Sequence, residues 1–289
     1  MTADSDLTPP VSHLTLPADP KASAADTASV TFIGTATVLL RLGAFTVLTD
    51  PNFLHAGDRA YLGKGLWSKR TTNPAIEIAE LPAYDVVVLS HLHDDHMDRI
   101  ARAELPKAPP VVTTRHGARE LRKDGFTTFG LRTWETQAVT KGGDATLRIT
   151  SMPGVHSTNP VLKAALPPVM GSMIELESSP GVVSRRVYIT GDTMPHLDLR
   201  QIATRYPDID LALLHLGGTR ILGMTVTMTG EHGAKLARLL APAQAAAIHY
   251  DDYPVFKSPL SDFRAAVERI GLPTTEVVHL SRGETHSFG

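Results

Sequence analysis

The sequence contains no cysteine among its 289 residues. This absence excludes disulfide bonds, thiolate nucleophiles and zinc sites built from cysteine. Any metal ion that the protein holds must therefore be bound by nitrogen and oxygen ligands. Hydrophobic residues make up 42% of the chain, which is enough for a sizeable core in one large domain or two small ones.

Long apolar runs and a strong net charge are also missing. No stretch reaches the 18 or so continuous apolar residues of a membrane-spanning helix. The N-terminus has no basic region followed by an apolar one, so we expect no signal peptide and a cytoplasmic location. The formal net charge of −2 provides no field that would attract nucleic acid, and no nucleic-acid partner is expected. None of these features indicates an oligomeric state.

The chain divides into a short tail and a long patterned region. Residues 1–27 are rich in small and polar residues without periodicity and are predicted to form a loose tail, and residues 28–289 are predicted to form one domain. Apolar runs predict strands first and then strands alternating with helices, twice over. This order favours an α/β fold in which two sheets form one sandwich with helices outside. We expect strands at 30–33, 38–42, 45–49, 84–90, 111–113, 126–130, 134–140, 145–151, 171–177, 185–190, 210–216, 245–248 and 275–280, and helices at 97–104, 115–123, 197–205, 229–240 and 260–270.

The most informative stretch of the chain lies at residues 91–96. Its pattern is HxHxDH, with ligands His91, His93, Asp95 and His96, and it follows the apolar run of the predicted strand at 84–90. Strand ends are where α/β proteins place their chemistry. Four coordinating groups in six residues are best explained by a cation that organises them.

Three further candidate ligands follow predicted strands in the same way. His156 comes after the strand at 145–151, Asp192 after the strand at 185–190, and His249 after the strand at 245–248. Taken singly, each could be a surface side chain, a turn residue or a satisfied half-buried group. Their shared position at strand ends favours one common site.

Seven side chains are too many for one ion and suit two ions that share a carboxylate. The sensible division assigns one ion to His91, His93 and His156. The second ion would be held by Asp95, His96 and His249, and Asp192 would bridge the two. Zinc is the expected metal, although nitrogen and oxygen ligands also suit manganese and iron.

Such a pair of divalent ions would supply a bridging hydroxide near neutral pH. The hydroxide would attack a carbonyl carbon or a phosphorus atom. Asp95 and Asp192 are the predicted catalytic carboxylates, because they could orient the nucleophile and carry a proton to the leaving group. No serine or cysteine nucleophile is required.

Three more residues are candidates for supporting roles. Asp50 and Asp98 could accept hydrogen bonds from ligand histidines and so fix their tautomers, although a turn residue and a helix cap are the plain alternatives. His215 ends the strand at 210–216 and is a candidate substrate contact.

Two loops, at 52–72 and 157–170, are more apolar than solvated loops usually are. We expect them to roof the cleft. They could either pack against each other or form a groove for the apolar part of a small-molecule substrate, and the sequence leaves both readings open.

At this point the chain resembles the metallo-β-lactamase fold superfamily. The HxHxDH element, His156, Gly191-Asp192 and His249 match its metal motifs in order. With Asp98 the first motif becomes HxHxDHxD, which is similar to the branch of the ascorbate-phosphate lactonases and the N-acyl-phosphatidylethanolamine phospholipase D, as is the block at 32–38. The chain departs from that branch in having Thr35 where histidine is usual.

The resemblance implies a four-layer αββα sandwich of two mixed sheets and a hydrolytic reaction. It does not define the substrate, which could be a lactone, another ester, an amide or a phosphodiester. The alternatives are an iron-dependent redox member of the same fold and a metal-binding scaffold without activity.

Overall fold

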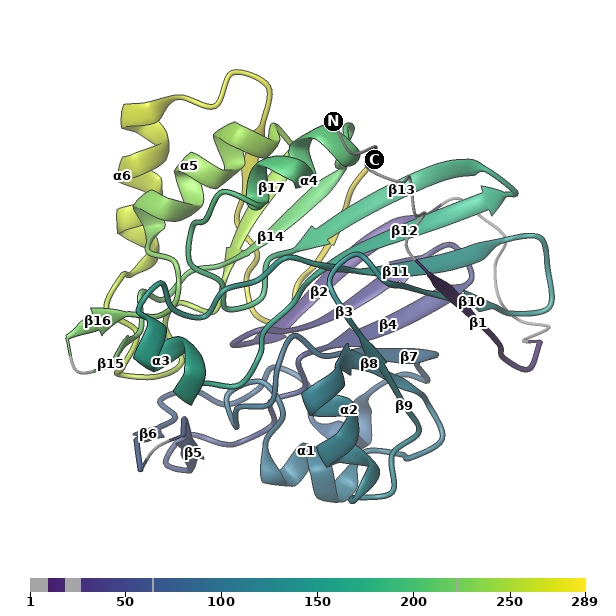
Figure 1. The fold of residues 1–289 in the computed structure, drawn as a ribbon, viewed down its shortest axis with the longest axis horizontal. Helices are drawn as coiled ribbons and strands as arrows, with labels where there is room; N and C mark the ends of the chain where they lie inside the picture. The colour runs from purple at the N-terminus through teal and green to yellow at the C-terminus, as the bar shows by residue number, and fades with distance from the viewer. Residues whose placement is uncertain (1–9, 19–26, 64, 222) are drawn as a thin grey trace, which may run out of the picture.

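Two large mixed sheets face each other in the protein, and helices cover the outer face of each (Figure 1). The structure is a computed structural model that describes residues 10–18, 27–63, 65–221 and 223–289. This architecture confirms the predicted α/β fold and its αββα layers. Within the described ranges, no helix is long and apolar enough to cross a membrane.

Among the described residues, the first large sheet has seven strands and is covered by two helices. In spatial order its strands are β19 (Thr285–Ser287), β2 (Ala28–Gly34), β3 (Thr37–Leu42), β4 (Phe45–Thr49), β7 (Val86–Val88), β8 (Val111–Thr114) and β9 (Thr128–Leu131). The helices are α1 (Arg99–Glu104) and α2 (Arg115–Arg122). Strands β2, β3 and β4 form the antiparallel meander that their closely spaced apolar runs predict. Strands β4, β7, β8 and β9 are parallel, and the two helices form crossovers between them.

In the part of the chain that the structure describes, the second large sheet has eight strands and is covered by three helices. In spatial order its strands are β1 (Val11–Thr15), β10 (Thr136–Thr140), β11 (Thr146–Met152), β12 (Gly171–Ser179), β13 (Val182–Ile189), β14 (Leu211–His215), β17 (Gln244–Ile248) and β18 (Glu276–Val278). The helices are α4 (Leu199–Arg205), α5 (Gly230–Leu240) and α6 (Leu260–Ile270). Its first half is mostly antiparallel, and its second half is parallel with one helix in each crossover.

Three apolar clusters fill the spaces between the four layers. Because successive residues of a strand point to opposite faces, one strand can feed two of them. In β13, Ile189 lies in the cluster between the sheets, and Tyr188 lies in the cluster under the helices α4, α5 and α6. The third cluster packs α1 and α2 on the first sheet through Ala101 and Leu121.

Several short elements lie in the loops that the sequence left irregular. They are β5 (Arg59–Tyr61), β6 (Trp67–Lys69), the 3₁₀ helix η1 (Ile78–Glu80), α3 (Pro160–Ala165), β15 (Arg220–Ile221) and β16 (Met224–Thr225). Strands β5 and β6 form a hairpin. Helix α3 begins with an Asn159 cap and a proline in its first turn, which is a usual helix start. These elements are too short to produce a periodic pattern.

The described part of the predicted tail differs from a loose segment. Residues 11–15 form β1, which pairs in parallel with β10 at the edge of the second sheet. Only Val11 and Leu14 of this strand are apolar, and both are half-buried, so backbone pairing rather than hydrophobic periodicity holds it. Residues 1–9 and 19–26 lie outside the described residues. The domain boundary at residue 28 remains a prediction.

Candidate metal centre

The predicted ligands come from strand ends of both sheets. The turn at 91–96 follows β7 of the first sheet, and His156, Asp192 and His249 follow β11, β13 and β17 of the second. The structure brings all seven predicted side chains together in two adjoining groups, and all seven are buried.

The first group consists of His91, His93 and His156, and we call it the three-histidine group. Its ligand atoms all lie within 4.8 Å of one another. The Nε2 atom of His91 is 3.0 Å from Nδ1 of His93, and Nε2 of His156 is 3.5 Å from that same Nδ1. Three ring nitrogens therefore face one small volume, as the ligands of a single ion would.

The second group consists of Asp95, His96, Asp192 and His249, and we call it the carboxylate group. Its ligand atoms also lie within 4.8 Å of one another. Nε2 of His96 is 3.4 Å from Oδ2 of Asp192, and Nε2 of His249 is 3.4 Å from Oδ2 of Asp95. The ring centroids of His91 and His96 are 4.2 Å apart, so the two groups are in direct contact through these rings.

Asp50 and Ser90 hold the rings at the back of the site. The Ser90 hydroxyl donates to Oδ1 of Asp50 at 2.7 Å and lies 3.0 Å from Nδ1 of His91. Since the hydroxyl gives its hydrogen to the carboxylate, it can accept one from Nδ1 of His91, which leaves Nε2 of that ring as the ligand atom. Asp50 also lies 3.4 Å from Nδ1 of His96. Its geometry therefore suits the predicted tautomer-fixing role.

Two neighbouring residues hold the opposite side of the site. The backbone carbonyl of Val226 lies 2.9 Å from Nδ1 of His156, and the Thr227 hydroxyl donates to Oδ2 of Asp192 at 3.0 Å. Sequence reasoning missed Ser90, Val226 and Thr227. Ser90 directly precedes the HxHxDH motif and could have been considered, whereas residues 226–227 lie in a loop without a local signal.

Asp98 differs from the predicted helper of a ligand histidine. One of its oxygens caps helix α1 by accepting from the backbone N–H of Ala101 at 2.8 Å. The other accepts from the Asn52 side chain and from the backbone N–H groups of Phe53 and Leu54. The carboxylate therefore ties the loop after β4 to the start of α1, which is the helix-cap alternative.

His215 also differs from the predicted substrate contact. Its side chain is fully buried, and its Nδ1 lies 3.6 Å from Oδ1 of Asp192. Among the described residues, neither ring nitrogen has a hydrogen-bond partner. The ring is therefore part of the wall around Asp192 and does not face solvent.

The donor set fits divalent ions on the evidence of its unpaired atoms. Buried polar atoms normally have hydrogen-bond partners. Within the described part of the chain, buried atoms without one include Oδ1 of Asp95, Nε2 of His96, Oδ1 of Asp192 and Nδ1 of His249. Four such atoms in one group are costly unless a cation satisfies them.

The electrostatics of the two groups differ. Burial, together with the neighbouring His96 and His93, holds the pKa of His91 well below its usual range, and burial lowers the pKa of His93 to about 3. Burial also opposes a charge on His96, but Asp192 and Asp95 outweigh it and hold the pKa of His96 well above its usual range. His91 and His93 thus present neutral imidazoles, while the carboxylates around His96 favour positive charge there.

The backbone at the strand ends is specially shaped. Asp50 and His249 adopt the left-handed region with φ of 36° and 60°, which residues other than glycine seldom do. Gly191 has φ of 60°, and a Cβ there would lie 2.5 Å from the carbonyl oxygen of Met170. Glycine is therefore required before Asp192. Such conformations concentrate at functional sites.

The two predicted roof loops occupy different places. The β5–β6 hairpin lies over the three-histidine group, because a Cβ on Gly63 would lie 3.5 Å from Nε2 of His93. The hairpin is attached to the metal turn by the Tyr61 N–H, which donates to Asp94 at 2.9 Å. Helix α3 packs through Leu162 on Val226, beside the residues that hold His156. The ring centroids of Tyr61 and Trp67 on the hairpin lie 4.9 Å apart with their planes tilted by 49°, and both side chains remain exposed.

Fold and site together define an αββα protein with buried His/Asp clusters that could hold metal ions. The Beta-lactamase superfamily domain matches residues 46–250. The chain belongs to this family, as the motifs at 91–96, 156, 191–192 and 249 predicted.

Curated relatives agree with this assignment, and a solved structure shares the fold. A metal-dependent hydrolase of Archaeoglobus fulgidus is 28% identical over 268 residues, covering 90% of this chain and 98% of the relative. The N-acyl-phosphatidylethanolamine-hydrolyzing phospholipase D 1 of Caenorhabditis elegans is 27% identical and covers 78% of this chain and 64% of the relative. The structure of a possible metal-dependent hydrolase from Veillonella parvula superposes with a TM-score of 0.74 at 23% identity, covering 90% of this chain and 99% of that one.

Proposed function

We propose that this metal-dependent hydrolase of the metallo-β-lactamase fold uses two divalent ions to cleave an ester, lactone, amide or phosphodiester bond. His91, His93 and His156 would hold one ion, and Asp95, His96 and His249 the other. Asp192 would bridge them. Zinc is the expected metal, with manganese and iron as alternatives.

The observation that carries the proposal is the convergence of seven donors from four separate strand ends. They divide into a group of three and a group of four, each within 4.8 Å. This is the donor number of two ions that share a carboxylate. When bound, such ions lower the pKa of a shared water toward about 7 and polarise the bond under attack.

The residues of the chain have distinct tasks in this scheme. The Thr227 hydroxyl holds Oδ2 of Asp192 and so directs Oδ1 of that carboxylate. Oδ1 of Asp95 and Oδ1 of Asp192 have no hydrogen-bond partner in the described part of the chain, which leaves them available to face the ions. The two carboxylates would orient the water at that place and help to carry its proton. The Val226 carbonyl and the Ser90 hydroxyl keep His156 and His91 in the tautomer that presents Nε2.

The proposed substrate is a small molecule with an apolar part. Tyr61 and Trp67, at 38% and 55% exposed, form a tilted aromatic pair on the hairpin that covers His93. They offer an apolar surface beside the reacting centre. The C. elegans relative is named for hydrolysis of a phospholipid, so an acylated phosphodiester belongs in the substrate panel.

Metal removal and return would test the proposal. Purified protein is analysed for metal content, dialysed against a chelator, and reloaded with Zn²⁺, Mn²⁺ or Fe²⁺. Each form is then assayed on lactones, aryl esters, amides and phosphodiesters. We expect two ions per chain and a hydrolytic activity that is lost with the metal and restored by one of the three.

Matched histidine variants complete the test. His93→Ala should abolish the metal-dependent activity with the fold retained, whereas His279→Ala changes an exposed histidine and should leave it intact. Stoichiometric iron with oxygen-consuming turnover would instead assign the chain to the redox class. Full metal loading without turnover on any substrate would favour a scaffold. Absence of bound transition metal would refute the proposal.

A further inference from the structure

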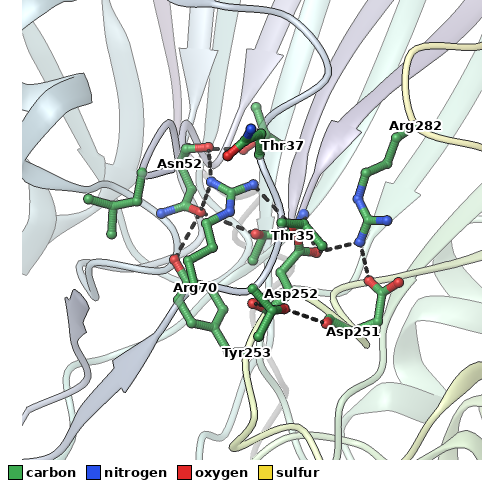
Figure 2. A network of polar contacts seen from close by, with 12 residues as sticks. Thr35, Thr37, Asn52, Arg70, Asp251, Asp252, Tyr253 and Arg282 are labelled. Atoms are coloured by element: carbon green, nitrogen blue, oxygen red, sulfur yellow. Dashed lines mark hydrogen bonds and ion pairs between the residues drawn. The ribbon is translucent and has the colours of Figure 1, made fainter. Parts of the chain in front are cut away.

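A buried ion pair lies between the roof hairpin and the loop that carries His249. Arg70 directly follows strand β6, and Asp252 lies three residues after His249; both are buried, at 1% and 0% exposed. Nη2 of Arg70 is 3.5 Å from Oδ1 of Asp252 (Figure 2). Arg282 at the edge of this network also reaches Asp252, at 3.2 Å.

From Asp252, hydrogen bonds lead directly to the backbone of His249. Oδ2 of Asp252 accepts from the N–H of Thr35 at 2.9 Å, and the carbonyl of Thr35 accepts from the N–H of His249 at 2.7 Å. Thr35 and His249 both adopt left-handed backbone, with φ of 51° and 60°. Such conformations persist only where the surroundings determine them strongly. The hydrogen bond from Thr35 to Asp252 holds the backbone of Thr35 in this conformation, and the hydrogen bond from His249 to Thr35 holds the backbone of His249.

From Arg70, hydrogen bonds lead to the other side of the metal centre. Nη1 of Arg70 donates to Oδ1 of Asn52 at 2.7 Å and to its backbone carbonyl at 3.0 Å (Figure 2). The side-chain amide of Asn52 donates in turn to the carbonyl of Asp94 at 2.7 Å and to Asp98 at 3.0 Å. The network therefore reaches the turn that carries Asp95 and His96, as well as the loop that carries His249.

The fit around Arg70 is close. Gly34, at the end of β2, has φ of 145°, which favours glycine, and a Cβ there would lie 2.9 Å from Nη2 of Arg70, so any other residue would have to displace the guanidinium. A buried ion pair contributes little to stability compared with apolar residues of similar volume, so stability alone is a weak reason for placing one here.

We infer that Arg70 and Asp252 are positioning residues for the ion of the carboxylate group. They set the distance between His249 on one loop and Asp95 and His96 on the other. His156 of the three-histidine group is held separately by the Val226 carbonyl, so the pair acts on one ion more than on the other. This inference rests on the proposed two-ion function.

Titration with Co²⁺ alone tests the inference. Chelator-treated protein is titrated by visible absorption, with the number of bound ions measured after dialysis, for wild type, Arg70→Met and the double variant Arg70→Met/Asp252→Leu. The matched control is Arg102→Met, which removes an arginine from the Arg102–Asp124 surface pair. Thermal unfolding of the metal-free proteins is measured in parallel.

We expect wild type and Arg102→Met to bind two Co²⁺. Arg70→Met should keep one and bind the second about tenfold more weakly or worse, as is usual when a residue that orients ligands is lost. It should also lose stability, because Asp252 is left without its buried partner. The double variant removes both charges and should regain that stability. It should not regain the second ion, since Asp252→Leu also removes the acceptor of the Thr35 N–H.

Three outcomes would overturn the inference. One is wild-type affinity for both ions in Arg70→Met. Another is an equal weakening of both ions, which would indicate general loosening. The third is recovery of the second ion in the double variant together with stability, which would make the pair a purely structural element. Fewer than two ions in the wild-type protein would contradict the proposed function itself, and the inference would fall with it.

Discussion

The two halves of the metal centre are built on different principles. In the three-histidine group, burial lowers the pKa values of His91 and His93 and so favours their neutral rings. In the carboxylate group, Asp95 and Asp192 hold the pKa of His96 well above its usual range, and the rings of His96 and His249 stack at 4.8 Å. The first group tolerates the absence of an ion, whereas the second requires a positive charge, from a proton or from a metal.

The largest expected effect comes from removing the charge of Asp192. Asp192→Asn keeps the shape of the side chain. It leaves Asp95 as the one negatively charged residue among the four side chains of the carboxylate group, and it weakens the proposed bridge. We expect kcat/KM to fall about 10³-fold or more and bound metal to fall below two ions per chain. Asp198→Asn, which changes an exposed carboxylate in the following loop, is the control. Retention of more than a tenth of the activity would contradict a bridging role.

The second prediction separates the two groups directly. His156→Ala should lose the ion of the three-histidine group and keep the one between Asp95 and Asp192. His249→Ala should do the reverse, and each should lower kcat/KM about 10²-fold. Metal analysis at matched free-metal concentration measures both. If either variant lost both ions together, the groups would form one cooperative site and the comparison above would fail.

The third prediction concerns pH and the neutral ring of His215. Burial lowers its pKa from 6.5 to about 4, against the raising effects of Asp50 and Asp192. Above about pH 6.5 the ring is neutral in both the folded and unfolded chain, so its contribution to stability is complete. As the pH falls from about 6.5 to 4, the unfolded chain binds the proton first, and the free energy of unfolding should drop by about 3 kcal/mol.

Urea unfolding of the metal-free protein at several pH values between those limits would measure this loss. In His215→Leu that part of the decrease should be absent, because the titrating ring is removed. Leucine should be tolerated at this position, since both nitrogens of the ring lack hydrogen-bond partners among the described residues. An equal decrease in wild type and variant would show that other groups dominate the acid response.

The sequence predicted the metal ligands because each stands shortly after an apolar run that indicates a strand. His91, His156, Asp192 and His249 each follow an apolar strand. His91, Asp192 and His249 follow strands of the parallel halves of the two sheets, whose carboxyl ends meet at one edge. His156 follows β11, which lies in the antiparallel half but runs in the same direction as β13. The sandwich of two sheets was also predictable from local patterns, because the order of strands followed by alternating strands and helices occurs twice along the chain.

Contacts between residues far apart in the sequence could not be predicted from such local patterns. Arg70 and Asp252 are 182 positions apart, and nothing near either residue indicates that they meet. Strands β1 and β19 lack an apolar pattern and are held by edge pairing. Local patterns reveal residues whose environment is set by their own strand, and they are silent about contacts that only folding creates.

The last prediction turns on two carboxylates that the sequence could not distinguish. Asp50 contacts Ser90 and lies beside His96, whereas Asp98 binds backbone N–H groups and caps α1. Asp50→Ala should therefore weaken metal binding about 10- to 100-fold. Asp98→Ala should lower the free energy of unfolding by about 2 kcal/mol with a smaller change in metal affinity. Metal titration and urea unfolding of both variants would measure the split. Equal losses of metal affinity would mean that Asp98 acts on the ligands through Asn52, and the helix-cap assignment would then be incomplete.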